Sequence, residues 1–168
     1  MLLYESNEYR ATKNWPYAIS AGCLIYRHQA DNIEVLLLSR EKKNDTWSAG
    51  NKQKSYHLPK GHVAFDELLT EAAQRESQEE AGCELAIKTY LGSINWDIIH
   101  PKTKFHVHKT VHYFAAEWLQ DLKEMDTEHD GREWVTLDEA MTLLGAPNPK
   151  GEDEIIRRLN AYLEAAAV

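Results

Sequence analysis

The stretch GHVAFDELLTEAAQRESQEEAG, which runs from Gly61 to Gly82, decides how this chain is interpreted, because its charges follow a helical period. At about 100° per residue, Glu76, Glu79 and Glu80 fall in the same arc of the predicted helix as its apolar residues. Three carboxylates directed toward the body of a protein are destabilising unless a cation neutralises them. The stretch therefore predicts a helix that carries a metal site.

The residue types in this helix indicate which metal it would bind. Oxygen ligands without cysteine suit Mg²⁺ or Mn²⁺, and Mg²⁺ commonly shares phosphate oxygens with a substrate. Arg75 is adjacent to Glu76 and one turn from Glu79, so we expect its guanidinium to orient a carboxylate and to limit the repulsion.

The same stretch predicts where the helix begins and ends. Asp66 is the expected N-cap, and Gly82 is the expected residue at which the helix stops. Ser77 falls on the arc opposite the apolar residues, so we expect it at the polar edge of the helix.

Two other segments are locally basic. EKKNDTWSAGNKQKSYHLPKGH precedes the helix, and HPKTKFHVHK follows it. Their lysines are Lys42, Lys43, Lys52, Lys54 and Lys60 in the first, and Lys102, Lys104 and Lys109 in the second. Each segment alone fits a solvated loop. Beside a metal-binding helix, the two together favour phosphoryl or pyrophosphate-bond chemistry.

The rest of the chain alternates strands and helices, which predicts an α/β fold with a mixed sheet. The expected hairpin spans 17–27 and 33–40, two long strands span 83–99 and 104–118, a short strand spans 132–137, and helices span 137–145 and 152–167. A chain of 168 residues fits one domain, 1–168.

Composition excludes several classes of protein. A formal net charge of -8 argues against a broad grip on long nucleic acid, so a small-molecule ligand is expected. Nowhere do about 18 apolar residues follow one another, which predicts no membrane span. Cys23 and Cys83 are the only cysteines and lie far apart, so no disulfide framework is expected and a cytoplasmic location fits best.

The strand predicted at 104–118 presents two different faces. His106, His108 and His112 share one face, which permits a metal site but more commonly marks a polar sheet surface. Lys109 and Tyr113 lie on the other face, where a role at the edge of the core and a role in binding are both open.

The 23 residues from Gly61 to Cys83 resemble the Nudix box of the Nudix hydrolases, and every charged and glycine position of that pattern is filled. The resemblance implies a Nudix-type α/β/α sandwich and metal-dependent hydrolysis of a nucleoside diphosphate linked to a further group. It implies the metal ligands Glu76, Glu79, Glu80 and the carbonyl of Gly61. Glu67 and Arg75 would support them, and Ser77 stands where the family usually has an aliphatic residue.

Segments spread over most of residues 20–140 are similar to the asymmetric diadenosine tetraphosphate hydrolases, which release ATP and AMP. By that resemblance, Lys60 and Lys109 would hold phosphates and Tyr113 would contact adenine or ribose. Glu128 would activate water or complete the metal shell, because carboxylates committed to metal are poor proton acceptors. Lys54, in the basic loop, is a further candidate for substrate binding.

The chain also departs from that group of hydrolases. Arg132 stands where an aromatic residue is usual, and Trp47 or Tyr56 would then supply the stacking surface. Three other functions stay open: a Nudix enzyme acting on (deoxy)nucleoside triphosphates, one acting on diphosphoinositol polyphosphates or a capped RNA end, and a catalytically silent nucleotide sensor. The acidic net charge disfavours RNA.

Overall fold

The computed structural model describes residues 7–41, 53–122 and 129–168. In chain order its elements are β1 (Tyr17–Gln29), β2 (Asn32–Glu41), β3 (Lys54–His57), β4 (Lys60–His62), α1 (Leu69–Ala81), β5 (Cys83–Ile99), β6 (His106–Asp121), β7 (Gly131–Thr136), α2 (Leu137–Leu143) and α3 (Glu152–Ala166). The predicted hairpin, the two long strands and all three helices are thus confirmed. Within these ranges, no helix is long and apolar enough to cross a membrane.

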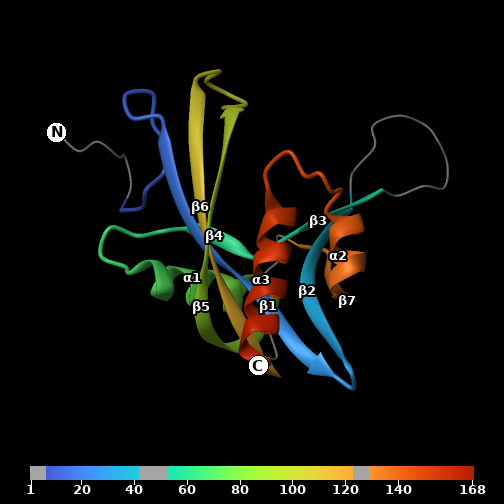
Figure 1. The fold of residues 1–168 in the computed structure, drawn as a ribbon. Helices are drawn as coiled ribbons and strands as arrows, with labels where there is room; N and C mark the ends of the chain where they lie inside the picture. The colour runs from blue at the N-terminus through green and yellow to red at the C-terminus, as the bar shows by residue number, and fades with distance from the viewer. Residues whose placement is uncertain (1–6, 42–52, 123–128) are drawn as a thin grey trace.

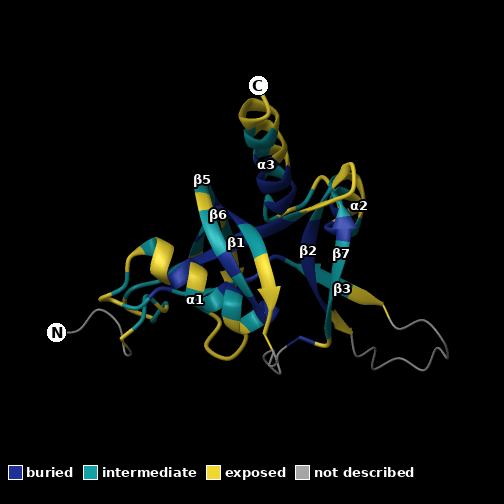
Figure 2. Cartoon of the chain, turned by 90° about the horizontal axis from the view of Figure 1, so that it is seen from below, coloured by how far each residue is buried: buried dark blue, intermediate teal, exposed yellow. Residues whose placement is uncertain are grey.

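The sheet lies between two layers of helices, as predicted (Figure 1). Because successive side chains of a strand point to opposite faces, β1 contributes to two cores. Leu24 and Tyr26 pack in the core beneath α2 and α3, whereas Cys23 and Ile25 pack in the core beneath α1. Buried residues therefore concentrate in the central strands and on the helix segments that face them (Figure 2).

The hairpin of β1 and β2 opens as it leaves its turn (Figure 1). The two strands pair only between Tyr26 and Gln29 on one side and Asn32 and Val35 on the other. Beyond this point β4 takes over the edge of β1, and β3 pairs with β2. The other edge of β1 pairs with β6 in parallel orientation, and the other edge of β2 pairs with β7 in antiparallel orientation. The sequence did not predict this opening, because β3 and β4, which pair with the separated strands, have only four and three residues. Strands this short show little periodicity.

A glycine of β1 allows the short strand β4 to lie close against it. A Cβ built on Gly22 would overlap the carbonyl oxygen of Pro59 and press on Lys60. The neighbouring Cys23 N–H donates to Pro59 O at 3.3 Å. This contact places the start of β4, and therefore Lys60, beside the C-terminal part of α1.

Two expectations for α1 are corrected. The N-cap is Leu68 rather than Asp66, and its backbone N–H donates to the Glu71 side chain at 2.8 Å. Ser77 is fully buried rather than at the polar edge, and its Oγ accepts a hydrogen bond from Cys23 N–H at 2.9 Å. The inner face is centred on the alanines and Ser77, so the carboxylates flank it. Gly82 ends the helix as predicted, with φ 63°.

Replacing Ser77 by alanine is expected to lower the free energy of unfolding by about 1 kcal/mol, because Cys23 N–H loses its shorter acceptor in a buried site. Urea denaturation measures the change. Thr70→Ala, on the exposed face of the same helix, is the control and should cost nothing. Equal stability of Ser77→Ala and wild type would show that this hydrogen bond does not hold α1 to β1.

Candidate active site

A cavity of about 510 Å³ lies where β1, β4, α1 and β6 meet the loop before α3. Its volume is in the range typical of small-molecule sites. The residues predicted as metal ligands all line it: Gly61, Glu76, Glu79 and Glu80. The lining residues lie up to 140 positions apart in the sequence, from Arg10 to Lys150.

The three carboxylates of α1 differ in their surroundings. Glu76 is largely enclosed, with 16% of its side chain exposed, whereas 60% of the Glu79 side chain is exposed. Glu80 accepts a hydrogen bond from Lys60 N–H at 2.9 Å, which joins the helix to β4. Glu79 thus lies at the open side of the cavity, and the expectation of three inward-facing carboxylates holds for Glu76 and Glu80.

Arg75 is hydrogen-bonded to two carboxylates, Glu67 and Glu76. Its guanidinium donates to Glu67 from Nε at 2.6 Å and from Nη2 at 2.9 Å, and Nη1 donates to Glu76 at 2.7 Å. Glu67 also accepts from Ala64 N–H at 3.0 Å, so the loop before α1 is bound to the middle of the helix. The hydrogen bonds from Arg75 lower the pKa of Glu67, which stays charged.

Gly61 lies against the carboxyl group of Glu76, and a Cβ built at Gly61 would overlap that group. Burial raises the pKa of Glu76, while the hydrogen bond from Arg75 opposes the rise. Glu76 therefore carries a charge that its surroundings compensate only in part. A side chain at this position would therefore move the Glu76 carboxyl group away from β4.

The donor set fits a hard divalent cation. Carboxylate and carbonyl oxygens line one cavity, and a cation would offset the cost of burying the Glu76 charge. In the described ranges, however, no three carboxylate, histidine or cysteine side chains converge as a ready-made cluster. Arg75 and Lys60 N–H hold two of the carboxylates instead, so metal binding would require these side chains to turn.

Cationic side chains also gather in the cavity. Within the described part of the chain they are Arg10, Arg40, Lys60, Lys109 and Lys150. Burial, and after it the charges of Lys60 and Lys150, lower the pKa of Lys109 to about 8, while Glu80 opposes this shift. The cavity therefore holds positive charge beside the carboxylates, an arrangement suited to binding phosphate next to a metal.

Histidines contribute polar but uncharged surface. Burial, with nearby cations as the smaller cause, lowers the pKa values of His57 and His62 to about 4. Both imidazoles are therefore neutral at neutral pH. The histidines of β6 lie elsewhere: His108 binds Asp97 at 2.7 Å and His112 binds Tyr90 at 2.8 Å, as expected for a polar sheet surface.

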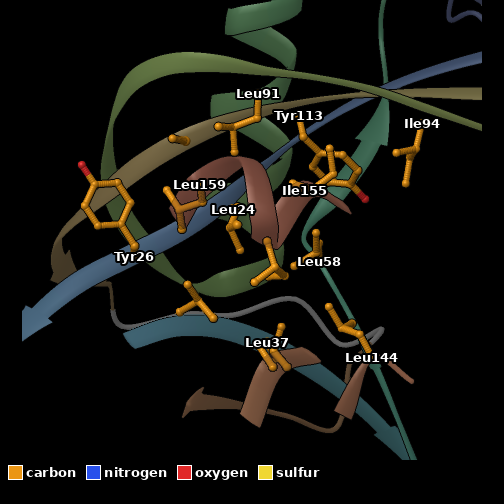
Figure 3. Close-up of a cluster of buried hydrophobic side chains, with 14 of the residues drawn as sticks. Leu24, Tyr26, Leu37, Leu58, Leu91, Ile94, Tyr113, Leu144, Ile155 and Leu159 are labelled. Carbon is orange, nitrogen blue, oxygen red and sulfur yellow. The ribbon is translucent and has the colours of Figure 1, made fainter. Parts of the chain in front are cut away.

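Three predicted substrate residues lie away from the cavity wall. Tyr113 is fully buried in the core among Leu24, Leu91 and other apolar side chains (Figure 3), so the expected contact with adenine or ribose is corrected. Tyr56 and Lys54 both bind Glu133, at 3.2 Å and 2.9 Å, on the side of β7. Alternation along a strand predicted the face of Tyr113 but did not reveal which neighbours cover it.

Other predicted residues have different outcomes. Glu128 and Trp47 lie outside the described residues. Arg132, which stands in place of an aromatic residue, donates to Ala81 O at 2.7 Å and pairs with Asp121 at 2.8 Å, so it stabilises the C-terminal end of α1. Sequence reasoning missed Arg10, Arg40 and Lys150, because isolated basic residues give no signal before the fold brings them together.

The fold and this cavity match a known family. A NUDIX domain model matches residues 16–159, and the chain belongs to the Nudix hydrolase family. The match includes the strands and helices that form the cavity.

Several relatives are about a third identical to this chain over the aligned residues. Nudix hydrolase 21, chloroplastic, of Arabidopsis thaliana is 36% identical over 133 residues, which is 76% of this chain and 60% of that protein. The chain thus spans less than two thirds of that relative. The asymmetrical bis(5'-nucleosyl)-tetraphosphatase of Sus scrofa is 31% identical over 136 residues, 74% of this chain and 82% of that protein.

Solved structures resemble the protein over most of its length. The Ap4A hydrolase of C. elegans, in a binary complex, superposes with a TM-score of 0.65 at 27% identity, covering 88% of this chain and 98% of that one.

If Glu76 binds a divalent metal, replacing Gly61 by alanine is expected to weaken Mn²⁺ binding and to lower hydrolysis on the order of tenfold to 100-fold, because the new methyl group displaces the Glu76 carboxylate. Steady-state kinetics and Mn²⁺ titration monitor the effect. The matched control is Gly131→Ala, whose Cβ would meet only the Ser39 hydroxyl at 3.3 Å and should leave both measurements near wild type. Unchanged Mn²⁺ affinity in Gly61→Ala would argue against Glu76 as a ligand.

Proposed function

We propose that this protein hydrolyses a pyrophosphate bond with the aid of a divalent metal, and that its first candidate substrate is a dinucleoside polyphosphate such as diadenosine tetraphosphate, giving ATP and AMP. The observation that carries the proposal is that carboxylate and cationic side chains line the same cavity. The names of the Sus scrofa and C. elegans relatives support the choice of substrate.

The proposed roles follow from where each side chain lies. Glu76, Glu79, Glu80 and the carbonyl of Gly61 would hold Mg²⁺ or Mn²⁺, which when bound would neutralise phosphate charge and activate water. Arg75 holds Glu76 at the cavity through the hydrogen bond described above, and Glu76 would turn from it to bind the metal. Lys60 and Lys109 would bind phosphate oxygens, and we add Lys150 to them because it lines the same cavity.

A second substrate class is favoured by one observation. Among the described residues that line the cavity there are five cations and no phenylalanine, tyrosine or tryptophan. Such a wall suits a densely phosphorylated ligand better than an adenine ring, which commonly stacks on an aromatic side chain. A diphosphoinositol polyphosphate is therefore the second candidate.

Product analysis by chromatography distinguishes these candidates. The protein is incubated with Mg²⁺ and, separately, with diadenosine tetraphosphate, ATP, dGTP, ADP-ribose and a diphosphoinositol polyphosphate. We expect ATP plus AMP from the first, with the others slower. Glu79→Gln, expected to lose about 100-fold or more in kcat, is the control for contaminating activity.

The other outcomes of this panel are equally informative. Preference for the diphosphoinositol polyphosphate would replace the first candidate by the second. Tight binding of a nucleotide with no turnover of any compound would refute hydrolysis and favour a sensor.

The lowered pKa of Lys109 predicts how substrate affinity depends on pH. With a pKa of about 8, this ammonium loses its charge as the pH rises through that value. If only the charged form binds phosphate, KM should rise about tenfold between about pH 7 and about pH 9. Lys109→Arg keeps its charge over this range, so the ratio of the two KM values removes the titration of the substrate itself. A constant ratio would exclude Lys109 from phosphate binding.

A further inference from the structure

Trp96 connects two of the cavity's cations. It lies on β5 as the direct cross-strand partner of Lys109 on β6, and its ring packs against the core beneath α3. The Nζ atom of Lys109 is 5.7 Å from the centroid of the indole, and the Nζ atom of Lys150 is 5.4 Å from it. Both distances are within the range of a cation–π contact.

The loop before α3 fixes the position of Lys150. Its backbone N–H donates to the Asn148 side chain at 2.8 Å. The next residue, Gly151, has φ 89° and lies against Ile94, which is two residues before Trp96 on β5. Glu152 then accepts from Leu58 N–H at 3.2 Å. Contacts on both sides therefore place Lys150 over the same part of β5 that carries the indole.

Two ammonium groups placed together repel each other, and something must offset that repulsion. A carboxylate partner would do so but would also cancel the positive charge that a phosphate requires. The negative face of an indole attracts both cations and leaves their charge in place. The two lysines line the cavity while they contact the ring, so their charge remains available to a ligand.

We propose that Trp96 is a positioning residue that holds Lys109 and Lys150 as one phosphate-binding pair. This inference rests on the proposed function, because it requires a polyphosphate in the cavity. The pair comes from β6 and from the loop before α3, and it shares the cavity with the carboxylates of α1.

Binding of inorganic tripolyphosphate without divalent metal, measured by calorimetry, tests the proposal independently of catalysis. Trp96→Leu is expected to raise Kd about fivefold to tenfold, and Trp96→Phe, which keeps a weaker aromatic face, less than that. In the Mg²⁺-dependent reaction, Trp96→Leu should raise KM by a similar factor and leave kcat near wild type.

Trp134→Leu is the matched control. This indole is also partly buried and lies beneath a cation, with Arg27 at 4.2 Å from its centroid, but it packs on the other core and Arg27 does not line the cavity. Trp134→Leu is expected to lower the free energy of unfolding without changing the Kd for tripolyphosphate. An equal rise of Kd in both variants would show a general loss of packing and would overturn the proposal.

A double-mutant cycle shows whether Trp96 acts through the lysine. If it does, Trp96→Leu should change Kd much less in a Lys150→Met background than in the wild type. Additive effects, or wild-type Kd in Trp96→Leu, would overturn this inference while leaving the proposed function intact. Failure of the wild-type protein to bind tripolyphosphate would instead contradict both.

Discussion

The close packing of α1 against β4 is the contact on which the rest of the site depends. Gly61 has no side chain, so the Glu76 carboxylate lies against the strand, and Lys60 N–H binds Glu80 directly. Arg75 adds a second connection through Glu67 to the loop before the helix. A single helix thereby presents its carboxylates at the edge of the sheet rather than to open solvent.

The opening of the hairpin provides the space for this contact. β1 and β2 separate after a short paired segment, and β4 occupies the edge that β1 would otherwise share with β2. Gly22 is needed for the same reason as Gly61, because the backbone of Pro59 lies against it. Gly22 and Gly61 therefore allow β1, β4 and α1 to pack closely against one another. The cavity forms beside this contact.

The carboxylates and the cations of the cavity are stabilised by different interactions. The carboxylates are held by hydrogen bonds from Arg75 and from backbone, and burial raises the pKa of Glu76 because this compensation is incomplete. Burial and, after it, the neighbouring cations lower the pKa of Lys109, and an indole contacts Lys109 and Lys150 without neutralising either. The charge of the carboxylates and the charge of the cations are each compensated only in part, and a bound metal and polyphosphate would compensate them further.

Local pattern in the sequence determined the α/β class, the helix of carboxylates and its end at Gly82, because periodicity and backbone conformation are properties of neighbouring residues. Family resemblance added Lys60 and Lys109. Only the tertiary structure decided that Ser77 is buried, that Tyr113 belongs to the core and that Arg10, Arg40 and Lys150 reach the cavity. These facts depend on which distant elements pack together, and burial at such contacts leaves no signal in the spacing of nearby residues.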